Sequence, residues 1–105
     1  MALTRKFRQT VMARIQTEPE FAIALYQEAI ELFLSGEPEA AKNILRDLVN
    51  ATIGFEALSQ AISTPPKSLH RMLSQAGNPT MSKLSAIFAA LREAIQKQIG
   101  TPIPN

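Results

Sequence analysis

Hydrophobic side chains recur every three or four positions along most of the chain, within segments that glycine and proline residues separate. The separating residues are Pro19, Gly36 with Pro38, Gly54, Pro65 with Pro66, Gly77 with Pro79, and Gly100 with Pro102 and Pro104. The segments between them are about 8 to 18 residues long, which together with this repeat is typical of amphipathic helices rather than strands. The pattern therefore predicts an all-α fold, a compact bundle of about six helices.

The apolar stripes locate the six helices along the chain. They run over residues 3–15, 21–33, 38–49, 55–62, 66–75 and 84–95. The second helix is apolar on most sides, so we expect it to lie centrally. We expect a single structural domain made of an N-terminal helical segment (residues 1–53) and a second helical region (residues 54–99), followed by a frayed tail (residues 100–105).

Proline and glycine also predict where individual helices begin and end. Pro38 fits the first turn of the third helix, where the missing N–H costs nothing. The pair Pro65-Pro66 can begin the fifth helix but cannot continue the fourth, so a turn must separate the two. Gly77 is expected to end the fifth helix with a positive φ. Thr80 or Ser82 is expected to cap the sixth.

Composition excludes several classes of protein. The 105 residues include no Cys and one His, which excludes thiolate metal sites and cysteine nucleophiles. No unbroken apolar run is longer than that of Phe21–Tyr26, which is far shorter than the roughly 20 residues that cross a bilayer. Arg8 and Arg14 bracket the one candidate apolar stretch near the N-terminus. We therefore expect no secretion signal, no membrane partner and a cytoplasmic protein.

The residue types used in catalysis do not form a reactive set in this sequence. Ser68 and His70 are two positions apart and so do not face each other on a helix. Asp47 is the one Asp of the chain. Glu28 and Glu31 lack the Glu-x-x-His motif of a metal-binding bundle and fit a solvated helix edge. The sequence thus predicts no enzyme, no metal site and no cofactor.

Charge is divided into zones, although the net charge is only +2. Residues 15–41 carry six Glu and no Lys or Arg, whereas four basic residues lie within the first 14. The segment from residue 55 to residue 83 contains three basic residues, Lys67, Arg71 and Lys83, and one acidic residue, Glu56. The basic first helix fits either a surface helix that packs on the core through its apolar stripe or an arm that docks on a partner or on DNA.

Residues 55–75 have the spacing of a helix-turn-helix, since two short helices flank a turn of about four residues. Apolar residues that can pack the two helices together are Leu58, Ile62, Leu69, Met72 and Leu73. The opposite surface then carries four residues that could read bases in the major groove: Lys67, Ser68, His70 and Arg71. Five further residues are expected to contact the DNA backbone: Gln60, Gln75, Asn78, Ser82 and Lys83. The alternative is an ordinary helical hairpin with a solvated polar face.

Particular residues favour the first interpretation. They are Leu58, the run Ser68-Leu69-His70-Arg71, the run Gly77-Asn78-Pro79, and the stretch from Leu84 to Leu91. With this combination, residues 54–91 resemble the lambda-repressor-like helix-turn-helix of the addiction-module antidote (antitoxin) family. Residues 21–50 resemble the helical lead-in of the same family. Three positions depart from its pattern: Ser59 replaces a small Ala, Ser63 replaces a Gly at the turn, and Pro65-Pro66 replaces the usual polar helix cap.

These observations together predict a cytoplasmic bacterial repressor that binds double-stranded DNA as a homodimer, with recognition helices about 34 Å apart. The resemblance further implies that the protein regulates its own operon. It also implies an alternative function, an antitoxin that neutralises a small ribonuclease-like toxin protein, for which the acidic segment Glu18–Glu39 is a suitable surface. Exposed apolar residues on the third or sixth helix could form the dimer contact, but the core requires the same residues.

Overall fold

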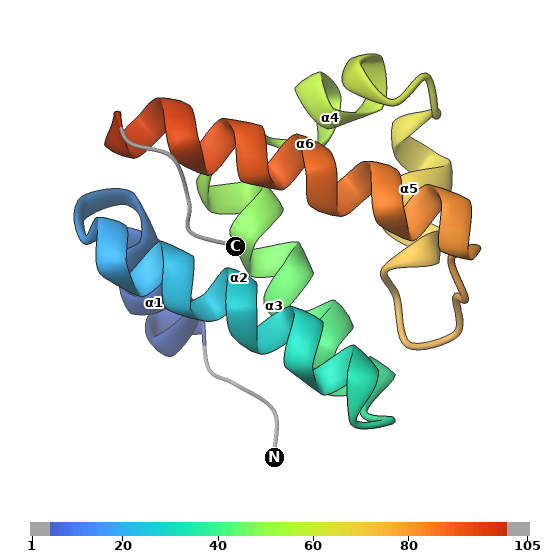
Figure 1. The fold of residues 1–105 in the computed structure, drawn as a ribbon, viewed down its shortest axis with the longest axis horizontal. Helices are drawn as coiled ribbons and strands as arrows, with labels where there is room; N and C mark the ends of the chain where they lie inside the picture. Colours follow the sequence, from blue (N-terminus) through green and yellow to red (C-terminus); the bar gives the residue numbers. More distant parts are fainter. Residues whose placement is uncertain (1–4, 101–105) are drawn as a thin grey trace.

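The computed structural model describes residues 5–100 and contains six α-helices in that range (Figure 1). Their bounds are α1 (Arg5–Thr17), α2 (Pro19–Leu34), α3 (Pro38–Ala51), α4 (Phe55–Ala61), α5 (Pro66–Met72) and α6 (Met81–Ile99). No strand occurs in the described part of the chain, so the predicted all-α fold is confirmed. Residues 1–4 and most of the predicted tail, residues 101–105, lie outside the described residues. No helix within residues 5–100 combines the length and the apolarity that a bilayer crossing requires.

Proline, threonine and glycine determine several helix boundaries. Helices α2, α3 and α5 each have a proline in their first turn and no side-chain cap. Helix α6 begins after Thr80, whose Oγ1 accepts a hydrogen bond from the backbone N–H of Lys83 at 3.1 Å. Gly100 ends α6 in the left-handed conformation, with a φ of 75°. The sequence-based predictions for Pro38, for the proline pair and for Thr80 are confirmed.

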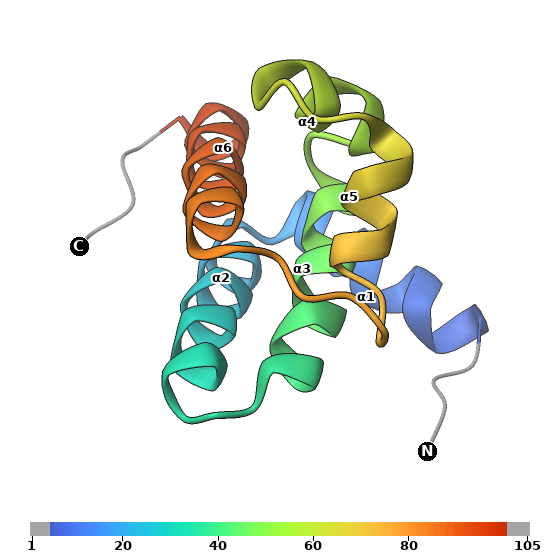
Figure 2. The same cartoon turned by 90° about the vertical axis from the view of Figure 1, so that its right-hand side faces the viewer.

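The helices enclose one hydrophobic core. Helix α2 packs against α1, α3 and α6, and α4 packs against α3, α5 and α6. Figure 2 shows α2 and α6 together on one side of the molecule, with α3, α4 and α5 on the other. A single cluster of buried side chains draws on all six helices, from Ile15 of α1 through Leu69 of α5 to Ile95 of α6. The short helix α5 is therefore attached to the same core as the N-terminal helices.

Helix α3 is more deeply buried than α2, the helix expected at the centre. Seven residues of α3 are buried, whereas three residues of α2 are. Although α2 contacts three other helices, it ends at the surface, where its last residue, Leu34, is 78% exposed. Part of the apolar surface of α2 thus serves no contact within the described chain.

The end of α5 differs from the prediction. Helix α5 stops at Met72 rather than Gln75, and Gly77 does not have the positive φ expected of a helix C-cap. Instead, the N–H of Gly77 donates to the carbonyl of Ser74 at 3.1 Å, and the Ser74 hydroxyl donates to the carbonyl of Arg71 at 2.7 Å. A Cβ added at Gly77 would lie 1.8 Å from the carbonyl oxygen of Arg71. Gly77 is therefore required for a close backbone approach.

Gly77→Ala should lower the free energy of unfolding by about 3 kcal/mol, because the added methyl group overlaps a backbone oxygen that cannot move without shifting α5. Gly36→Ala is the matched control. Its Cβ meets open space and the substitution costs only the strain of a positive φ, about 1 kcal/mol. Urea denaturation followed by circular dichroism measures both values. Equal losses in the two variants would contradict this role of Gly77.

Candidate nucleic-acid interface

Helices α4 and α5 pack on each other through apolar side chains. Leu58 of α4 is fully buried, as are Leu69 of α5 and Leu73 directly after it. Ile62 and Met72 are partly buried against the same cluster. The five residues that the sequence assigns to this contact therefore all lie in or beside the core. The core holds the inner side of α5 in place, and the other side of the helix faces outward.

Local hydrogen bonds order the turn between α4 and α5. Ser63 adopts the left-handed conformation, with a φ of 52°, at the position where the resemblance implies glycine. The buried Thr64 donates its backbone N–H to the carbonyl of Ser59 at 3.0 Å and its hydroxyl to the carbonyl of Ile62 at 3.1 Å. The Nζ of Lys83 donates to the Oγ1 of Thr64 at 2.6 Å. Because Lys83 belongs to the first turn of α6, this bond ties the turn before α5 to the helix after it.

Two basic side chains of α3 hold the backbone that follows α5. The side chain of Lys42 is 1% exposed, and its Nζ donates to the carbonyls of Ser74 at 2.9 Å and Gly77 at 2.7 Å. The same ammonium lies 3.0 Å from a carboxylate oxygen of Glu39. The guanidinium of Arg46 donates to the carbonyl of Leu73 and to the side-chain oxygen of Asn43. These bonds satisfy carbonyls that follow the end of α5 and hold the loop after the helix against α3.

The outward side of α5 is polar and basic. Lys67, His70 and Arg71 are exposed, and they are spaced three and four positions apart, so they lie on one stripe of the helix. Ser68 is half-buried beside them. The imidazole of His70 stacks on the ring of Phe55 at the start of α4, with 3.9 Å between ring centroids and 21° between planes. One face of the His70 ring is thus covered by Phe55, although the side chain is exposed overall.

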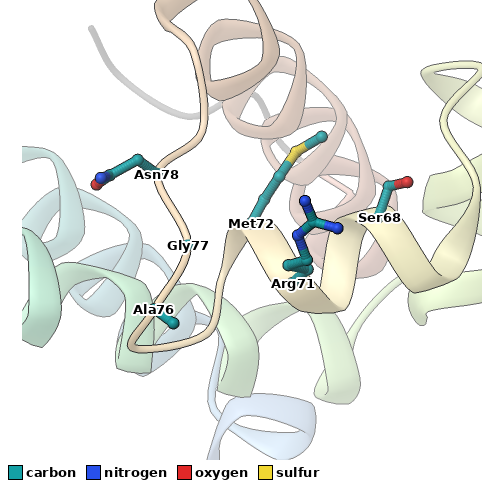
Figure 3. A pocket seen from close by; sticks show the side chains of 6 residues that line it. All are labelled: Ser68, Arg71, Met72, Ala76, Gly77 and Asn78. Carbon is teal, nitrogen blue, oxygen red and sulfur yellow. The ribbon is translucent and has the colours of Figure 1, made fainter.

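A pocket of about 380 Å³ lies between α5 and the loop that follows it. It is lined by Ser68, Arg71, Met72, Ala76, Gly77 and Asn78, and we name it the α5 pocket. Figure 3 shows Arg71 and Met72 projecting from the same side of α5, while the side chain of Asn78 points away from Arg71. The structure therefore brings Ser68, Arg71 and Asn78 to one pocket, although the sequence assigns two of them to bases and one to the backbone.

The remaining predicted residues lie on separate elements. Gln60 is exposed on α4, Gln75 is exposed on the loop after α5, and Ser82 is exposed in the first turn of α6. Lys83 is half-buried because its ammonium contacts Thr64. Lys67 stands with His70 and Arg71 on the stripe of α5. The segment from residue 55 to residue 83 contains these three basic residues and one acidic residue, Glu56, which is exposed.

The sequence-based analysis missed Lys42 and Arg46. A signal for Lys42 was present, because this residue lies between Ala41 and Leu45 on the apolar stripe of the third helix. A lysine there is buried, and a buried ammonium requires partners. The identity of those partners, carbonyl oxygens more than 30 positions away, is not encoded in any local pattern.

Among the described residues, no group of His, Asp or Glu side chains is arranged to hold a metal ion. Comparisons with protein-family models, with curated proteins and with solved structures each found no match.

Lys42→Met should lower the free energy of unfolding by about 3 kcal/mol, because two backbone carbonyls of the loop after α5 lose the ammonium that donates to them. Lys97→Met is the matched control, since the ammonium of Lys97 makes an exposed ion pair with Glu93 at 3.2 Å. That variant should lose no more than about 0.5 kcal/mol. Thermal and urea unfolding of both variants provide the measurement. A Lys42→Met variant as stable as the Lys97→Met control would show that the ammonium does not hold the loop.

Proposed function

We propose that this protein is a sequence-specific DNA-binding regulator whose α5 enters the major groove as the second helix of a helix-turn-helix formed with α4. The observation that carries the proposal is the division of α5 into two sides. Leu69 is fully buried on the inner side, whereas Lys67, His70 and Arg71 are exposed together on the outer side. A helix presented in this way has the form required for reading base edges.

The anchoring of α5 at both ends supports the same proposal. Thr64 is bonded to Lys83 before the helix, and the backbone after the helix is bonded to Lys42 and Arg46. A helix held by bonds to α3 and α6 loses little conformational freedom when it binds, so less of the contact energy is spent on ordering it. A solvated helical hairpin, the alternative interpretation, has no need of such anchoring.

Each predicted contact residue takes a role that fits its position. Arg71 can pair through two nitrogens with guanine, and Lys67 and Ser68 can reach neighbouring base edges. The exposed His70 can offer a ring nitrogen to a base edge. Gln60, Gln75, Asn78 and Ser82 lie exposed around α5 and suit contacts to phosphate and sugar, as does Lys83 with the N–H bonds that Thr64 does not use.

We propose further that the regulator is a cytoplasmic transcriptional repressor and acts as a homodimer on two half-sites. The three basic residues against one acidic residue between residues 55 and 83 favour attraction to phosphate over the whole interface. Binding should therefore weaken steeply as the salt concentration rises.

Duplexes selected from a random-sequence library by repeated binding should share a common sequence that the protein prefers over scrambled DNA by 10³-fold or more. Arg71→Ala should weaken binding to the selected duplex by about 1–3 kcal/mol and reduce the preference, because a base contact is lost. Fluorescence anisotropy over a salt series measures both effects, and Lys97→Ala on the exposed surface of α6 is the control. If no sequence is enriched, or if Arg71→Ala weakens binding to selected and scrambled DNA equally, base reading by α5 is wrong.

A second candidate function is the binding of a basic protein, such as a small ribonuclease-like toxin. Six Glu residues of the segment Glu18–Glu39 are exposed, and they are Glu18, Glu20, Glu28, Glu31, Glu37 and Glu39. Glu18 pairs with Arg14 and Glu39 with Lys42, so part of this charge is used within the chain. Figure 2 shows α3 between α2 and α5, so the acidic surface of α2 lies apart from α5. Glu28→Lys should therefore weaken binding of such a partner, whereas Arg71→Ala should not.

A further inference from the structure

The two most exposed large apolar side chains of the described residues lie at one place. Leu34, the last residue of α2, is 78% exposed, and Met81, the first residue of α6, is 82% exposed. Both line an open hollow of about 510 Å³ between the two helices, which we name the α2–α6 groove. Its other lining residues are Ile30, Phe33, Leu84, Ser85 and Phe88. Single exposed apolar residues are ordinary, but two beside an apolar hollow mark a contact surface.

The groove is a built feature rather than a gap that side chains could close. The ring of Phe88 makes edge-to-face contacts with Phe33 and with Tyr26, at centroid distances of 5.9 and 5.6 Å. The Tyr26 hydroxyl donates to the carbonyl of Phe88 at 3.1 Å. Burial raises the pKa of this phenol, an effect that Arg92 opposes, so the donor remains protonated at neutral pH. The Thr80 cap and the hydrogen bond from the Glu37 N–H to the Leu32 carbonyl hold the two helix ends that carry Met81 and Leu34.

We propose that the α2–α6 groove is the contact surface between two copies of this chain. A two-fold contact requires a patch that is complementary to itself. This patch carries both halves of such a contact, since two projecting side chains stand beside the hollow that could receive them. A groove for an unrelated ligand needs the hollow alone.

Charged residues near the groove also favour a second copy of this chain as the partner. On α2, Glu31 is exposed and lies three positions before Leu34. On α6, Arg92 follows Phe88 by one helical turn and is close enough to Tyr26 to affect its phenol. Charges of opposite sign thus lie near the groove on its two helices, Glu31 on α2 and Arg92 on α6. A second copy related by a two-fold axis can set the acidic edge of one molecule against the basic edge of the other, whereas a partner of one charge sign suits only one edge.

The position of the groove also leaves α5 uncovered, and this part of the argument rests on the proposed function. The loop that lines the α5 pocket with Gly77 and Asn78 continues directly to Met81 at the groove. Because α2 and α6 lie on one side of the molecule and α5 on the other (Figure 2), two copies that share the groove leave both α5 helices free to contact DNA.

The first test is the mass of the protein in solution, measured by sedimentation equilibrium over a wide range of concentration. The wild type should approach twice its chain mass of 11.5 kDa as concentration rises. The double variant Leu34→Glu, Met81→Glu should raise the dimer Kd by roughly 100-fold or more, because apolar anchors at the centre of a contact dominate its affinity. Both side chains are exposed in the monomer, so the circular dichroism spectrum should remain helical. The control Ala13→Glu, Ala57→Glu changes exposed positions of α1 and α4 and should leave the Kd unchanged.

The second test uses the absence of cysteine from the chain. Leu34→Cys should join two copies through a short bismaleimide, whereas Ala13→Cys should not. A wild type that stays monomeric at all concentrations overturns the proposal, as does a dimer that survives the double charge substitution or links equally well through Ala13→Cys. A wild type that stays monomeric but binds selected DNA overturns this interface and the proposed homodimer, and leaves base reading by α5 standing. A dimer that dissociates in the charge variant but shows no DNA preference leaves the interface standing and refutes the proposed function.

Discussion

The buried ammonium of Lys42 is the interaction on which the geometry of the candidate site depends. It satisfies two carbonyls of the loop after α5 and is itself balanced by the partly exposed carboxylate of Glu39. A charged group at 1% exposure is tolerable only with this complete set of partners. The loop must therefore lie against α3 in one arrangement, and the end of α5 lies with it.

The remaining features of the site follow from that arrangement. Because the loop folds back over the end of α5, the backbone at Gly77 comes so close to Arg71 that no Cβ can be accommodated. The same fold places Asn78 and Arg71 around one pocket. At the other end of α5, the bond between Lys83 and Thr64 holds the turn that precedes the helix. Helix α5 has only seven residues, and its position comes from these neighbours rather than from its own hydrogen bonds.

The molecule carries two different surfaces, separated by α3 and the core. Around α5 the surface is basic and polar, as a contact with phosphate and base edges requires. Between α2 and α6 it is apolar with edges of opposite charge, as a contact between proteins requires. The loop from residue 73 to residue 80 connects the two surfaces along the chain.

The sequence by itself determined the helical class, the start of helices at proline and the side of α5 that is buried, because periodicity and the missing N–H of proline act over a few residues. It also indicated the candidate residues of α5, since Lys67, His70 and Arg71 share one stripe. It did not determine where α5 ends, the reason for Gly77, or the roles of Lys42 and Arg46. Those depend on contacts between residues about 30 positions apart, and only the tertiary structure decides which carbonyl a buried ammonium reaches.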